Sequence, residues 1–208
     1  GLSTRAFPLG DGQHTEVLVC TRDRHGLFAE LTGAFAANLI DVTQANLFTG
    51  PEGWVLDSFI VSDAKQQRAL TPAQVNAVRA TLESVLLEGG LIGAEVERSR
   101  RRLFGLLQPR VPVRTVVSFD NEVSRTDTVI DIEAGDRTGL LYDIANTLAH
   151  LQVEVRAARI ITDVRRARDA LYVQERGGKI ESPQKQAAIR AALHNALEPP
   201  TALGLTGD

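Results

Sequence analysis

Two stretches of the chain alternate apolar and polar residues, and each is followed by a helical pattern. Residues 15–20 (TEVLVC) and 128–134 (TVIDIEA) alternate in the way that half-buried strands do. After each stretch, apolar residues recur every three or four positions, which predicts an amphipathic helix with one face in a core. The positions on that face are Leu27, Phe28, Leu31, Phe35 and Leu39 after the first stretch, and Leu140, Leu141, Ile144, Leu148 and Leu151 after the second.

Both patterns belong to one internal repeat. Residues 21–49 align without a gap on residues 134–162, at a constant offset of 113 (136 minus 23). A β-hairpin and a second helix follow in each copy, and the second helices begin at Thr71-Pro72 and Ser182-Pro183, which are typical cap and first-turn residues. The order strand, helix, strand, strand, helix predicts an α+β protein made of two ferredoxin-like (βαββαβ) domains in tandem.

Each domain needs a fourth strand. In the first copy, residues 111–119 (VPVRTVVSF) can supply it, after a Gly- and Arg-rich connection. The second copy runs out at Glu198-Pro199-Pro200, so we expect its sheet to stay three-stranded or to borrow residues 4–9, where Pro8 restricts a strand to an edge. The predicted organisation is an N-terminal extension with a candidate edge strand (1–14), a first domain (15–122) with an Arg-rich insertion (89–110) before its last strand, and a second domain with the C-terminal tail (123–208).

Composition narrows the function classes. The chain is 43% apolar and 24% charged, as ordinary globular domains are, and its net charge of −3 gives no general attraction for nucleic acid. The single cysteine excludes a disulfide framework, the four histidines show no metal-ligand spacing, and no apolar run reaches the roughly 18 residues of a membrane span. We therefore expect a cytoplasmic protein with no cofactor, metal, nucleic-acid partner or membrane. Because the chain contains no methionine, we also expect it to be a piece of a longer one.

The repeated loop between the first strand and the first helix carries the candidate chemistry. It reads DRHG at residues 23–26 and DRTG at residues 136–139. Free backbone N–H groups and the helix dipole make a helix start a receptor for a carboxylate, and glycine lets a ligand approach closely. Asp23 and Asp136 can offer a negative charge to an ammonium group, so the loop suits a zwitterion. The alternative is structural: aspartate caps the helix and glycine shapes the turn.

The strand, the D-R-x-G-L sequence, the amphipathic helix and the hairpin resemble the ACT domain, a ferredoxin-like module that commonly binds amino acids between paired copies. Residues 53–61 (GWVLDSFIV), 111–122 (VPVRTVVSFDNE) and 128–162 further resemble the C-terminal tandem ACT region of the bifunctional protein-PII uridylyltransferase/uridylyl-removing enzymes, over about residues 15–197. The resemblance implies a regulatory region that senses glutamine and controls the modification of the PII protein. Its partners would be the catalytic domains of the parent enzyme, where Mg²⁺ is expected. Their Gly-Ser and His-Asp motifs have no counterpart here, so we expect no catalysis by this chain itself.

The resemblance also implies ligand contacts from the loop, the start of the helix and the start of the next strand in each copy. ACT pairing can arise within one chain or through a dimer. The two sites need not be equivalent, because Leu151 replaces Asn38 in the second copy. The implied contacts are Asp23, Arg24, Gly26, Leu27, Phe28, Asn38, Ile40, Asp41 and Val42 in the first copy, and Asp136, Arg137, Gly139, Leu140, Leu141, Val153, Glu154 and Val155 in the second.

Other interpretations stay open at this point. The pair can be a structural or protein-interaction module, with the arginine cluster at 98–102 either a solvated loop or a dock for an acidic partner. RNA binding would need exposed aromatic residues, for which Phe59 and Tyr172 are the best candidates in a chain with 5% aromatic residues. An acylphosphatase-like enzyme would need an arginine in a phosphate loop and an asparagine, and Arg24 with Asn46 is a nominal match.

Overall fold

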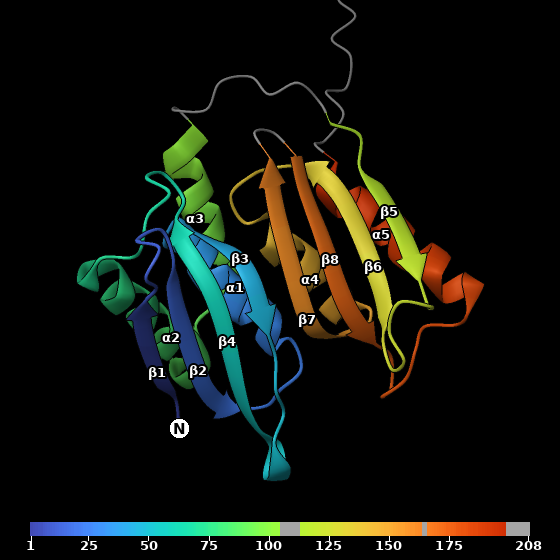
Figure 1. Ribbon diagram of the computed structural model, residues 1–208, viewed down its shortest axis with the longest axis horizontal. Coiled ribbons are helices and arrows are strands. Elements are labelled where there is room, and N and C mark those ends of the chain that lie inside the picture. The colour runs from blue at the N-terminus through green and yellow to red at the C-terminus, as the bar shows by residue number, and fades with distance from the viewer. Residues whose placement is uncertain (105–112, 164–165, 199–208) are drawn as a thin grey trace, which may run out of the picture.

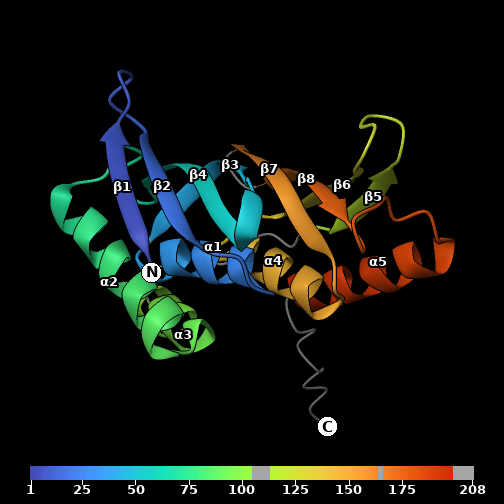
Figure 2. The same cartoon turned by 90° about the horizontal axis from the view of Figure 1, so that it is seen from below.

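A computed structural model describes residues 1–104, 113–163 and 166–198 of the chain. These residues form one eight-stranded antiparallel sheet, in the order β1-β2-β4-β3-β7-β8-β6-β5, with five helices on one face (Figures 1 and 2). Within this described part, no helix is long and apolar enough to cross a membrane. The strands are β1 (Ser3–Pro8), β2 (Thr15–Arg22), β3 (Ile40–Asn46), β4 (Trp54–Asp63), β5 (Val116–Asp120), β6 (Thr128–Gly135), β7 (Glu154–Asp163) and β8 (Arg166–Gln174), and the helices are α1 (Leu27–Ala37), α2 (Pro72–Glu88), α3 (Ile92–Phe104), α4 (Leu140–His150) and α5 (Pro183–Leu197), with a short 3-10 turn at Pro51–Gly53.

The predicted pair of ferredoxin-like α+β units is confirmed, and the repeat extends to backbone detail. Gly26 and Gly139 precede the first helix of each half with φ of 79° and 77°. Leu39 and Gln152, again 113 positions apart, both have positive φ, at 57° and 58°. A bulge then follows at the same place in β3 and β7. Two halves with the same unusual backbone angles must present their loops in the same way.

The predicted origin of the fourth strands is wrong in both halves. Residues 111–119 were expected to close the first sheet, but β5 begins at Val116 and pairs with β6 of the second half. Residues 4–9 were expected to serve the second sheet, but β1 pairs with β2 of the first half. Each half therefore takes its fourth strand from the segment that precedes its first repeated strand, and the second sheet is not three-stranded. The placement of β1 at the edge of the sheet is confirmed, and Pro8 stands at its end.

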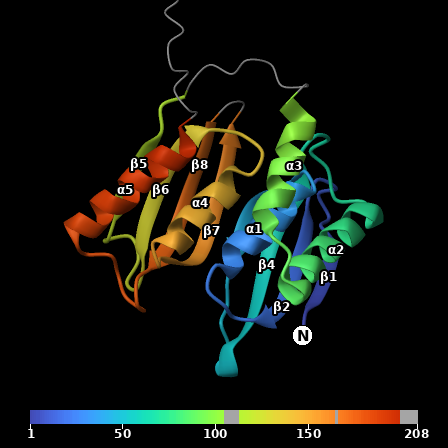
Figure 3. The ribbon, with the colours of Figure 1, turned by 180° about the vertical axis from the view of Figure 1, so that it is seen from behind.

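The halves join within one chain through β3 and β7. Three residue pairs make this seam, and the central one joins Ala45 to Ala158, which are equivalent positions of the repeat. A pseudo-twofold axis therefore passes between these two alanines. Both alanines are buried in the core, and α1 packs beside α4 on the helical face of the sheet (Figure 3). The seam is short, so the flanking loops can line the spaces at its two ends.

The Arg-rich insertion forms the helix α3 in its described part, and not the solvated loop of one interpretation; residues 105–110 lie outside the described residues. Ile92 and Val96 bury one side of α3 against α1 and α4. Gly33 of α1 is required for this contact, because a Cβ there would lie 2.4 Å from Cγ1 of Ile92 and 2.9 Å from the ring of Tyr142. Arg98, which pairs with Glu95, is exposed at the surface, whereas Arg100 is half-buried, so only part of the cluster faces solvent.

Candidate ligand sites at the seam

Two cavities lie at opposite ends of the seam, each between the loop of one half and a strand of the other. The first cavity, of about 410 Å³, is lined by the loop at residues 23–28 and by the start of β7. The second cavity, of about 50 Å³, is lined by residues 136, 137 and 139–141 of the other loop and by the start of β3. Because β3 and β7 are antiparallel, the start of one strand lies beside the end of the other. The repeat thus yields two crossed sites, in each of which the loop of one half faces the strand of the other half.

The structure brings together all but one of the residues that the sequence singled out. Asn38 lines neither cavity, since its amide donates to the carbonyl of Ala34 at 2.8 Å and to Oγ1 of Thr81 at 3.0 Å, which ties the end of α1 to α2. A ligand role for the other residues stays a prediction. The first cavity collects Asp23, Arg24, Gly26, Leu27, Phe28, Val153, Glu154 and Val155, and the second collects Ile40, Asp41, Val42, Asp136, Arg137, Gly139, Leu140 and Leu141.

The helices that face the cavities begin without a side-chain cap. The N-cap residues of α1 and α4 are Gly26 and Gly139, and no side chain accepts a hydrogen bond there. By contrast, α2 and α5 are capped by Thr71 and Ser182. The alternative in which Asp23 and Asp136 cap the helices is therefore wrong. First-turn amides without a cap, at the positive end of a helix, are a ready receptor for a carboxylate.

The arginines of the repeated loop hold the loop in place. Nε of Arg24 donates to Oε2 of Glu30 at 2.8 Å, and its guanidinium also reaches the carbonyls of Val85 and Leu86 at the end of α2. Arg137 likewise pairs with the carboxylate of Asp143 and donates to the carbonyl of Ala196. Because Arg24 is occupied in this way, its guanidinium does not cradle a phosphate, and the acylphosphatase interpretation loses its arginine.

Sequence reasoning missed two buried aspartates, one in each cavity. Asp57 of β4 and Asp169 of β8 occupy equivalent positions and are each 3% exposed. Burial raises the pKa of both carboxyl groups to about 7, and repulsion from Asp23 or Asp136 of the adjoining loop acts in the same direction. The available signal was the aspartate shared by the two aligned strands, LDSFIV and RDALYV, at a position that packs inward.

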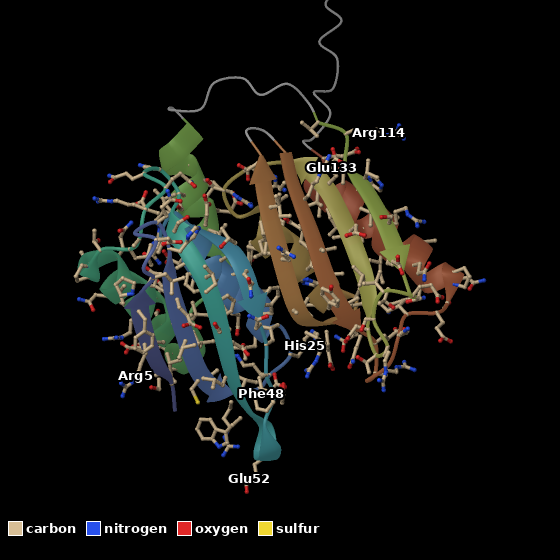
Figure 4. The ribbon with its side chains drawn as sticks, viewed as in Figure 1. Arg5, His25, Phe48, Glu52, Arg114 and Glu133 are labelled. Atoms are coloured by element: carbon tan, nitrogen blue, oxygen red, sulfur yellow. The ribbon has the colours of Figure 1, made fainter. Side chains whose placement is uncertain are left out.

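The surroundings of the two aspartates differ. In the first cavity, Oδ1 of Asp57 accepts the backbone N–H of Phe48 at 3.3 Å, and Arg156 opposes the rise of its pKa. The side chain of His25 reaches across the seam, where its Nε2 lies 3.1 Å from the amide nitrogen of Gln152 (Figure 4). The first cavity therefore presents both acidic and basic groups, which suits a zwitterion.

The second cavity is acidic. Asp41 stands at its rim, where desolvation of its carboxyl group and repulsion from Asp136 and Asp63 raise its pKa to about 6. Oδ1 of Asp169 has no hydrogen-bond partner among the described residues. Those residues also contain no group of three or more histidine, cysteine, aspartate or glutamate side chains that could hold a metal ion.

The RNA-binding interpretation loses one of its two aromatic candidates, Phe59. Phe59 is fully buried, with its ring 5.0 Å from that of Phe35 and 6.3 Å from that of Phe28, between centroids. A side chain in that position cannot stack on a base.

The chain is similar in sequence to known proteins. Residues 116–206 match the family described as an ACR9-like, ACT-like domain. The chain is 36% identical over 196 residues to the bifunctional uridylyltransferase/uridylyl-removing enzyme of Azospirillum brasilense, and 34% and 30% identical over 207 and 198 residues to those of Rhodospirillum rubrum and Gluconobacter oxydans. These alignments cover 90%, 95% and 92% of the chain, respectively, but the chain spans only about a fifth of each relative (20%, 21% and 20%). Among solved structures, aspartate kinase from Synechocystis matches with a TM-score of 0.43 and 15% identity, over 86% of this chain and 26% of that one.

Proposed function

Since the chain is a pair of ACT-like domains homologous to part of the bifunctional uridylyltransferase/uridylyl-removing enzymes, we propose that it is an amino-acid sensor whose first cavity binds glutamine. In the parent enzyme, this binding would control the attachment of uridylyl groups to the PII protein and their removal. The catalytic domains of the parent would be the partners of this region, and the cytoplasm its compartment.

The first cavity supports the proposal by its size and by its charges. A volume of about 410 Å³ lies within the range of about 300–1,000 Å³ that small-molecule sites occupy. The uncapped start of α1 and the guanidinium of Arg156 can receive the carboxylate of an amino acid. Asp23 and Asp57 can receive its ammonium group. The presence of both receptors in one cavity is the observation that carries the proposal.

The crossed arrangement supplies a route from binding to regulation. A ligand in the first cavity contacts the loop of one half and the start of β7 in the other half, so it adds contacts across a seam of three residue pairs. A ligand shifts such an equilibrium only by its differential affinity for the two arrangements. A Kd near 1 mM corresponds to about −4 kcal/mol, which a few hydrogen bonds can supply. Tightening of the seam would then alter how the pair packs on the catalytic domains.

Isothermal titration of the purified chain with glutamine tests the proposal, with glutamate and alanine as competing amino acids. The variant Gly26→Asn should abolish binding, because Gly26 lines the first cavity and an asparagine side chain there would occupy the space of the ligand. Asparagine tolerates positive φ, so the loop should keep its conformation. The matched control is Gly177→Asn, at φ of 78° in a turn that lines neither cavity. Equal binding by the two variants, or no selectivity for glutamine, would contradict the proposal. In the full-length enzyme, Gly26→Asn should also remove the effect of glutamine on PII modification.

A further inference from the structure

The second cavity contains a buried carboxyl group, that of Asp169, whose Oδ1 atom has no partner among the residues that the structure describes. Asp169 is 3% exposed, and its Oδ1 accepts no hydrogen bond from any described residue. Buried polar atoms in native proteins nearly always have a partner, because desolvation without one is costly. Asp169 lines the cavity together with Asp41 and Asp136, so a donor held in the cavity lies beside its carboxyl group.

Among the residues that the structure describes, no basic side chain supplies that donor. Arg137 lines the cavity, but its guanidinium pairs with Asp143 and donates to the carbonyl of Ala196. Arg100 of α3 also pairs with Asp143, at 2.7 Å, and donates to the carbonyls of Thr138 and Gly139. The position equivalent to Arg156 of the first cavity is Thr43. Within the described part of the chain, the first cavity therefore has an available guanidinium, that of Arg156, and the second cavity has none.

We propose that the second cavity binds a primary ammonium group, with Oδ1 of Asp169 accepting one of its N–H bonds and with Asp136 and Asp41 balancing its charge. A volume of about 50 Å³ admits such a group alone, either as a small free ion or as the end of a longer amine. An ammonium group carries three directional donors, which can bridge carboxylates that do not converge as metal ligands do. The inference goes beyond the proposed sensing of glutamine and does not depend on it.

Binding of a cation in this cavity is coupled to protons. The pKa values of Asp169 and Asp41 are raised to about 7 and about 6, so below neutral pH these groups hold protons that compete with a cation. The charged and titratable groups around Asp169 are Asp41 of β3, Asp136 and Arg137 of the loop, and Tyr142 of α4, with Asp63 acting on Asp41. An ammonium group should therefore displace a proton to the buffer, and its affinity should rise from pH 6 to pH 8.

Chemical-shift mapping of the ¹⁵N-labelled chain with methylammonium chloride tests the proposal. Saturable shifts are expected for amides of residues 136–142 and 40–42. They should require at least about tenfold more methylammonium in Asp169→Asn, which keeps the size of the side chain and removes its charge. Asp131→Asn is the matched control, because it removes an exposed carboxylate from the neighbouring strand β6 and should leave the affinity unchanged. Addition of 1,4-diaminobutane distinguishes the two sources, since tighter binding of the diamine would identify the end of a longer amine.

Three outcomes would overturn the inference. Equal shifts with sodium chloride or tetramethylammonium chloride would show a general salt effect, because neither cation donates an N–H bond. Unchanged binding in Asp169→Asn would remove the proposed acceptor. An affinity that does not change between pH 6 and pH 8 would remove the coupling to protons. A parallel titration with glutamine reports on the amides of residues 23–29, so failure of the first-cavity proposal is seen separately.

Discussion

The two buried aspartates should make the chain less stable as the pH rises through neutrality. Asp57 and Asp169 have pKa values of about 7 in the folded chain, against an ordinary value of 3.8. Between these values the folded state binds protons that the unfolded state has lost, so the free energy of unfolding falls with increasing pH. The stability that protonation provides is greatest at acidic pH and is lost above about pH 7.

The size of the effect follows from the linkage relation. For a carboxyl group with a folded pKa of about 7, the difference in bound protons between the folded and unfolded states, integrated from pH 5.5 to pH 8, is about 1.5 pH units. This corresponds to about 2 kcal/mol in the free energy of unfolding. The two aspartates together should therefore lower the free energy of unfolding by about 4 kcal/mol over this interval. Asp63 and Asp127, whose pKa values are lowered, titrate at more acidic pH and do not contribute here.

Urea unfolding of the wild type and of Asp57→Asn/Asp169→Asn at pH 5.5 and pH 8 measures this difference. The double variant should be the more stable protein at pH 8, and it should have lost most of the pH dependence. Asp41, whose pKa is raised to about 6, and every other titratable group are common to both proteins and cancel in the comparison. A double variant whose stability changes with pH in parallel with the wild type would show that the two carboxyl groups are not desolvated as the structure places them.

Two further predictions concern the helix α3 and its supports. Arg100→Gln should lower the free energy of unfolding, measured in urea, by about 1–3 kcal/mol, because the half-buried guanidinium joins Asp143 to two loop carbonyls. Arg98→Gln, at an exposed pair, should lower it by less than about 1 kcal/mol. Equal losses in the two variants would show that α3 does not hold the second loop. Gly33→Ala should lower the free energy of unfolding by about 1–3 kcal/mol, because the added Cβ overpacks against Ile92 and Tyr142. Gly10→Ala, where a Cβ meets nothing within 4 Å, should change it by no more than about 0.5 kcal/mol. An unchanged stability of Gly33→Ala would show that α3 does not approach α1 this closely.

The repeat made most of the fold predictable. A constant offset, the shared D-R-x-G-L loop and two matching apolar faces fix the same unit twice, and the structure confirms both units down to the positive φ of Gly26 and Gly139. The origin of the fourth strands was not predictable in this way, because strand pairing is non-local. The pattern of apolar and polar residues at 116–120 fits the edge of either sheet, and only the strand pairing in the structure shows that these residues pair with β6.

The loops of the candidate site were predictable from the sequence, but the strand residues that line the rest of each cavity were not. The loop residues stand out because they repeat, but the crossing of each loop to the opposite strand depends on the seam at Ala45 and Ala158, which no local pattern marks. Asp57 and Asp169 escaped notice for a different reason. In the strand WVLDSFIV, apolar residues occupy both faces, so alternation does not show that the aspartate points inward.

The pseudo-twofold axis between Ala45 and Ala158 also has a genetic consequence. In a dimer assembled from two identical chains, each substitution occurs in both binding sites at once, so neither site can change alone. In this chain the two halves are separate stretches of one coding sequence, and a codon change at Thr43 leaves Arg156 untouched. Selection can therefore preserve one cavity while it remodels the other, and the covalent joining of the halves keeps the two together throughout.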